Sequence, residues 1–200
     1  MKLTLYPDSN SEAGQESFVL NMLEEKHNGF YVEIGAFESM RTNNTYLLET
    51  QFNWTGVAFE WLEEPAKDYN ENRRNPCLQV DATTFDYLEY FVKNNFPKQI
   101  DYLQVDIDPP RDTLNCLKQL PHSEYRFSTI TFEHDLYSGN ADVKEEQKEL
   151  LLSLGYVLAF ENVKVVVPGW PDREFEDWWV DPAVVPEDRY VGVSLYAFGP

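Results

Sequence analysis

The feature that most constrains the fold is the alternation of strand-like and helix-like stretches between Ser17 and Val167. Short runs of apolar, β-branched and aromatic residues, typical of buried strands, are separated by stretches with apolar residues at helical spacing. This alternation favours parallel strands covered by helices on both faces. The fold class that we predict is a Rossmann-like doubly wound α/β sheet, mostly parallel with an antiparallel edge. Its expected strands are residues 30–34, 56–60, 77–80, 101–107, 127–132, and the two edge segments 156–159 and 163–167.

The end of the chain differs in composition, because Pro, Trp and acidic residues dominate from Pro168 onward. We therefore predict a Rossmann-like domain over residues 1–167 and, over residues 168–200, a cover packed on the same domain. Trp170, Trp178 and Trp179 are expected to attach this cover to the core or to line a pocket beneath it.

The charge of the chain limits its partners. The formal net charge is −19 at pH 7, a balance that repels phosphate backbones and anionic membranes. We expect no nucleic-acid or membrane partner, and a small-molecule or glycan partner that is neutral or cationic. Because the N-terminus lacks a long apolar segment, a cytoplasmic location is expected. Cys77 and Cys116 have no metal-ligand spacing and are predicted to be buried, reduced thiols.

Acidic residues gather where the predicted strands end. In an open α/β sheet the ligand lies beyond the carboxyl ends of the strands, so these positions indicate a binding site. Gly35 directly follows the first strand, where a residue without a side chain permits a tight turn and close approach of a ligand. The acids at or just past the ends of the first four strands are Glu33, Glu60, Asp81, Asp106 and Asp108.

The residues after Gly35 separate two classes of ligand. A dinucleotide site requires G-x-G-x-x-G, and Phe37 and Met40 occupy the second and third glycine positions. A ligand without a pyrophosphate is therefore favoured, and the carboxylates favour a cation with hydroxyl groups. S-adenosylmethionine has a sulfonium, an ammonium and a ribose diol. We predict that Glu60 accepts hydrogen bonds from the ribose hydroxyls and that Asp81, beside Ala82, accepts one from the adenine amine.

Several segments together resemble a known family. The runs GFYVEIGA at 29–36, NTYLLE at 44–49, WTGVAFE at 54–60 and IDYLQVDID at 100–108 are similar to the FkbM family of methyltransferases. The shorter GQE at 14–16 and FEH at 132–134 also resemble it. The resemblance implies a class I S-adenosylmethionine-dependent methyltransferase acting on a hydroxyl of a sugar or small natural product. The predicted cofactor-binding residues are Glu33, Gly35, Ala36, Phe37, Ser39, Asn44, Glu60, Trp61, Asp81, Ala82 and Asp106.

This sequence departs from the family pattern at two places. Glu38-Ser39 replaces the usual residue plus glycine at the methionine end of the cofactor site, and Asp108-Pro109-Pro110 replaces an acid, a glycine and a small residue on the acceptor side. Asp108-Pro109-Pro110 also resembles the D-P-P-Y motif of amino methyltransferases, in which an aromatic stacks on the target base. Arg111 occupies the place of that aromatic, so N-methylation remains the alternative.

A hydroxyl acceptor must lose its proton during transfer, and Asp106, Asp108 and His134 are the predicted candidates for the base. His134 is equally compatible with a structural role at the sheet edge. Asp106, Asp108 and Asp135 can alternatively hold a divalent cation, although a metal-free site is favoured. A third alternative is a protein that binds the cofactor without turnover, because the cofactor-binding residues do not establish that an acceptor binds.

Overall fold

The computed structural model describes residues 3–167 and 170–193, and of residues 165–167 and 170–172 it describes the backbone alone. The predicted roles of the Trp170 side chain and of residues 168–169 and 194–200 lie outside this description. In the described part of the chain no helix is long and apolar enough to cross a membrane.

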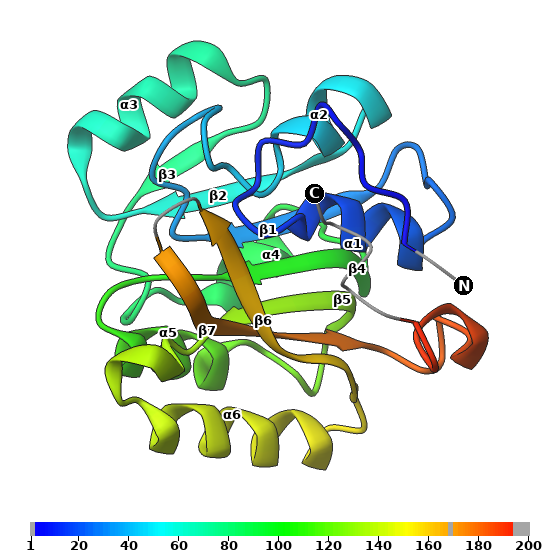
Figure 1. Cartoon of the computed structure of the whole chain (residues 1–200). Helices are drawn as coiled ribbons and strands as arrows, with labels where there is room; N and C mark the ends of the chain where they lie inside the picture. Colours follow the sequence, from blue (N-terminus) through cyan, green and yellow to red (C-terminus); the bar gives the residue numbers. More distant parts are fainter. Residues whose placement is uncertain (1–2, 168–169, 194–200) are drawn as a thin grey trace.

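The strands form one sheet in the order β3-β2-β1-β4-β5-β7-β6 (Figure 1). All neighbours from β3 to β5 are parallel, whereas β7 runs antiparallel to both β5 and β6. The predicted fold class, a mostly parallel doubly wound α/β sheet with an antiparallel edge, is thereby confirmed. The strands are β1 Phe30–Ile34, β2 Thr55–Glu60, β3 Cys77–Gln79, β4 Gln99–Val105, β5 Arg126–Glu133, β6 Val157–Val167 and β7 Trp170–Val180.

Residues 170–180 were expected to belong to the cover, but they form strand β7 of the sheet. Strand β7 inserts between β5 and the edge strand β6, and β6 is one strand with register shifts rather than two separate segments. Successive residues of a strand point to opposite faces, so Trp178 and Trp179 are both fully buried, one in each core. This burial outweighs the low strand propensity of the acidic residues between them and Pro168.

Helices cover both faces of the sheet (Figure 1). One apolar core packs α1 and α2 against the sheet around Phe18 and Trp178, and α3 joins this face through Tyr69. The other core packs α4, α5 and α6 around Phe91, Leu117 and Trp179. The helices are α1 Gln15–Met22, α2 Tyr46–Phe52, α3 Glu63–Asn72, α4 Tyr87–Lys93, α5 Pro110–Gln119 and α6 Ala141–Ser153, with 3-10 turns at Leu136–Ser138 and Glu187–Arg189.

The register of the central strands determines what meets at their carboxyl ends. Ile34 lies beside Val105, and Val105 lies beside Phe132. The residues that follow them, Gly35, Asp106 and Glu133, are therefore neighbours at one edge of the sheet.

Candidate cofactor site

The turn after β1 depends on Gly35. Its φ is +86°, a conformation that residues with a side chain rarely adopt, and its N–H donates to the Phe59 carbonyl at 2.9 Å. A Cβ added at Gly35 would overlap the backbone oxygen of Asp106. Glycine is thus required for the chain to leave β1 in contact with the end of β4. The next residue, Ala36, is buried and donates to the same Phe59 carbonyl at 3.3 Å.

Glu60 at the end of β2 is held by backbone donors on both sides. Its Oε2 accepts from the Phe37 N–H at 2.9 Å, and its Oε1 accepts from the Leu62 N–H at 2.8 Å. Each carboxylate oxygen retains a lone pair for a further donor. Phe37 and Trp61, next to these contacts, are 56% and 66% exposed. A fixed carboxylate beside exposed aromatic side chains is suited to a ligand that has hydroxyl groups and a flat ring.

The loop after β3 is tied to the same place. The Val80 N–H donates to the Glu60 carbonyl at 2.9 Å, which sets Asp81 just beyond Glu60 along the edge. One oxygen of Asp81 accepts from the backbone and hydroxyl of Thr83, at 2.9 and 2.6 Å, and Ala82 is buried. The predicted partners of the ribose and the adenine are therefore brought together.

Glu33 has a different environment from Glu60, because it is only 1% exposed and its partners come from the protein itself. It accepts from the Thr45 hydroxyl at 2.8 Å and from the Asn43 side-chain amide at 3.0 Å. The Tyr69 hydroxyl is a third donor, at 3.2 Å. Burial raises the pKa of Glu33, and the charge of Arg73 opposes that rise. Glu33 therefore acts on the site by fixing the loop above it.

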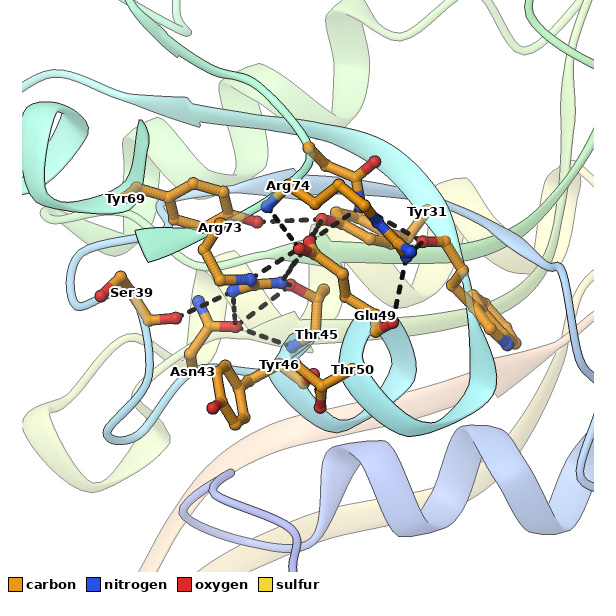
Figure 2. Close-up of polar contacts among 12 residues, drawn as sticks. Tyr31, Ser39, Asn43, Thr45, Tyr46, Glu49, Thr50, Tyr69, Arg73 and Arg74 are labelled. Carbon is orange, nitrogen blue, oxygen red and sulfur yellow. Dashed lines mark hydrogen bonds and ion pairs between the residues drawn. The ribbon is translucent and has the colours of Figure 1, made fainter. Parts of the chain in front are cut away.

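Arg73, which the sequence analysis did not identify, organises this loop (Figure 2). Its guanidinium donates to the Ser39 carbonyl at 2.9 Å, to Asn43 Oδ1 at 2.8 Å and to Thr45 Oγ1 at 3.0 Å. It also pairs with Glu49 at 3.0 Å, with both side chains buried. Ser39, a predicted cofactor residue, is buried and contributes its carbonyl to Arg73.

Asn44, in the same loop, is buried and its Oδ1 has no hydrogen-bond partner in the protein. A buried amide oxygen without a donor is costly, so this atom is available to an N–H group of a ligand.

Asp106 and Glu133 form a carboxyl pair at the ends of β4 and β5. A hydrogen bond joins the two side chains. Burial raises the pKa of Asp106 to about 6, and the negative charges of Asp135 and Asp108 add to the rise. Burial and the charge of Asp106 raise the pKa of Glu133 further, well above its usual value. Of the two acids, Glu133 therefore holds the shared proton more strongly, and Asp106 is the one that ionises first.

His134 is fully buried behind this pair. Its Nδ1 accepts from the Leu136 N–H at 3.1 Å, and its Nε2 lies 3.4 Å from Asp177 Oδ1 on β7. The ring thus holds the turn after β5 and contacts β7, an environment that fits the structural alternative for His134.

The remaining candidates on the acceptor side lie at the surface. Asp108 is exposed. Arg111, in the place where a D-P-P-Y motif has its aromatic, pairs with Asp142 and Glu146 of α6. Across the described residues, no group of three His, Cys, Asp or Glu side chains is arranged to hold a metal ion.

No family model and none of the curated proteins matches this sequence. Solved structures do match its fold. An rRNA methylase from Streptococcus thermophilus is 10% identical with a TM-score of 0.51, over 83% of this chain and 93% of that one. An S-adenosylmethionine-dependent O-methyltransferase from Thermotoga maritima is 16% identical with a TM-score of 0.53, over 83% and 64%. Aeropyrum pernix fibrillarin, with bound S-adenosylmethionine, is 11% identical with a TM-score of 0.50, over 78% and 67%. The chain has the Rossmann-like fold of these methyltransferases.

Proposed function

We propose that this protein is an S-adenosylmethionine-dependent methyltransferase of the FkbM type, which methylates a hydroxyl of a sugar or small natural product. The observation that carries the proposal is the position of Glu60. In a methyltransferase fold, at the end of β2, its carboxylate is fixed by the N–H groups of Phe37 and Leu62 and is adjacent to the exposed Trp61.

The residues at the edge of the sheet fit the cofactor from one end to the other. Glu60 would accept from the ribose hydroxyls and Asp81 from the adenine amine. The loop of Gly35 and Ala36 would hold the methionine end. There the buried, unpartnered Oδ1 of Asn44 supplies an acceptor for an ammonium group.

When bound, the cofactor would supply an electrophilic methyl group on a sulfonium sulfur, with a neutral thioether as the leaving group. Asp106 accepts the proton that the acceptor hydroxyl loses, because it is ionised at neutral pH. The hydrogen bond with Glu133 favours the ionised form of Asp106 and thereby limits the strength of this base. Much of the rate arises from holding the oxygen in line with the methyl group.

The charge of the chain supports a neutral or cationic acceptor. Some proteins of similar fold are rRNA methylases, but a net charge of −19 repels RNA at long range. A cytoplasmic location and the absence of nucleic-acid and membrane partners remain predictions.

Isothermal titration calorimetry with S-adenosylmethionine and S-adenosylhomocysteine tests the cofactor site. We expect affinities in the roughly micromolar range, and about 1–3 kcal/mol weaker binding for Glu60→Gln. Glu64→Gln on the exposed face of α3 is the matched control and should bind as the wild type does. Folded protein that gives no heat with either ligand would refute the proposal.

Transfer of a radiolabelled methyl group to hydroxylated acceptors tests turnover. Asp106→Asn should lower the rate by a larger factor than it lowers the affinity for S-adenosylhomocysteine. Cofactor binding without transfer to any acceptor would favour a binding protein, and a methylated nitrogen in the product would favour the N-methyltransferase alternative.

A further inference from the structure

The acceptor side of the site is lined by carboxyl groups from several parts of the chain, which we call the carboxylate rim: Glu12, Asp106, Asp108, Glu133 and Asp135. The parallel pairing of β4 and β5 sets Asp106 beside Glu133. The charges of Asp135, Asp108 and Glu12 all raise the pKa of Asp106, which places these groups within electrostatic reach of it. The N-terminal loop thus adds its negative charge to that of the strand ends.

Asp135 has a buried oxygen without a partner. The residue is 8% exposed, and its Oδ1 makes no hydrogen bond within the protein. The backbone holds the residue at a φ of +47°, with its N–H donating to the Phe175 carbonyl at 3.1 Å and its carbonyl accepting from the Ser138 N–H at 2.9 Å. A desolvated carboxylate oxygen beside other carboxylates is costly unless a donor from outside the protein reaches it.

Gln104 on β4 is a second and independent observation. It is 1% exposed, and neither its amide nitrogen nor its amide oxygen has a partner. Side chains two residues apart on a strand share a face, so Gln104 lies on the same face as Asp106, one layer below the rim. A buried amide without partners, on the same strand face as Asp106, indicates that polar groups of a ligand complete this part of the site.

The chemistry of the rim selects the charge of that ligand. An acceptor with a phosphate or a carboxylate would meet like charges in a poorly solvated place, whereas an ammonium supplies both a positive charge and N–H donors. The net charge of −19 attracts such a cation from a distance.

We propose that the acceptor carries an ammonium group near the hydroxyl that is methylated, as in an amino sugar or an amino alcohol, and that Asp135 Oδ1 binds this ammonium at the carboxylate rim. The inference rests on the proposed function, because the rim is the acceptor side of that same site. Asp135 selects the acceptor, and Asp106 takes the hydroxyl proton.

The test compares amines with their neutral derivatives by calorimetry on the full chain saturated with S-adenosylhomocysteine. The probes are glucosamine, galactosamine and 2-aminocyclohexanol, each paired with its N-acetyl derivative. We expect at least one amine to bind about tenfold more tightly than its N-acetyl partner. The preference should disappear in Asp135→Asn, since asparagine keeps the shape and tolerates a positive φ. Glu149→Gln, an exposed site on α6, removes the same formal charge and should keep the preference.

Equal binding within every pair, or no binding of any amine, would overturn the inference, as would a preference that survives in Asp135→Asn. If Asp135→Asn does not fold, the exposed Asp108→Asn replaces it and should reduce the preference by weakening the rim. Binding of S-adenosylhomocysteine is measured first in the same cell. Its loss would count against the proposed function, whereas cofactor binding without amine preference would count against this inference alone.

Discussion

Replacing Arg73 by methionine should destabilise the protein strongly, because no water can take over the bonds that the guanidinium makes. The Arg73 side chain is 0% exposed and donates five hydrogen bonds, to Tyr31, Ser39, Asn43, Thr45 and Glu49. At about 1 kcal/mol each, these bonds contribute roughly 5 kcal/mol, and the packing of methionine returns about 1–2 kcal/mol. We expect the free energy of unfolding to fall by about 3–4 kcal/mol at pH 8, within the range for breaking a buried ion pair.

The size of this loss should depend on pH. Burial raises the pKa of Glu33 while Arg73 opposes the rise. At Glu49 burial also favours the neutral acid, but Arg73, with donors from Arg74 and Asn75, keeps the pKa below its usual value. Without Arg73 both pKa values rise, so the folded variant takes up protons that the unfolded chain has released. Stability gained in this way is lost as the pH rises through the folded pKa values. The difference in unfolding free energy between the wild type and Arg73→Met should therefore be smaller at pH 5 than at pH 8.

The measurement is equilibrium unfolding in urea, followed by tryptophan fluorescence at both pH values. Arg74→Met is the matched control, because Arg74 is the adjacent residue and is exposed. Arg74 donates hydrogen bonds to Asn53 and to the carbonyls of Glu49 and Trp54. Arg74→Met should lower the free energy of unfolding by about 1 kcal/mol. A loss for Arg73→Met equal to that of the control, or independent of pH, would show that the buried network does not hold this loop.

Three further outcomes follow from the geometry. Gly35→Ala should lower the unfolding free energy by several times the approximately 1–2 kcal/mol expected for Gly155→Ala, since both glycines have positive φ but only Gly35 lies against a backbone oxygen; equal losses in urea titrations would contradict this. Burial raises the pKa of Glu176 from 4.5 to about 8, so stability should fall as the pH rises from about 4.5 to about 8 and then level off, and Glu176→Gln should flatten that profile. The methyl-transfer rate should decline below about pH 6, where Asp106 becomes protonated. A rate that stays unchanged down to about pH 4.5 would exclude Asp106 as the base.

Much of the sheet could be predicted from local patterns. The strands β1, β2, β4 and β5 are mostly buried on both faces and read as apolar runs, and Gly35 and Glu60 mark the turns where ligands bind in such sheets. Strand β7 could not be predicted in this way. Its sequence mixes acidic and aromatic residues without a strict alternation, and only its pairing with β5 and β6 shows that Trp178 and Trp179 face separate cores.

The candidate site shows the same limit for charged groups. Glu33 and Glu60 look alike in the sequence, as acids at the ends of neighbouring strands. The difference between them is made by Arg73, far along the chain, whose guanidinium lies beside Glu33. No spacing rule connects these positions, because the contact exists only once α3 packs on the sheet.

This difference divides the acids at the carboxyl edge into two groups with separate tasks. Glu33 and Glu49 are compensated by Arg73 and fix the loop that follows β1. Asp106, Glu133 and Asp135 act on one another instead, and an oxygen of Asp135 remains without a donor. Folding alone gains nothing from crowding carboxyl groups in this way, whereas a base and a cation-binding group need it. The structure therefore keeps charge compensation on the cofactor side and leaves the acceptor side negative, where an ammonium would supply the missing charge.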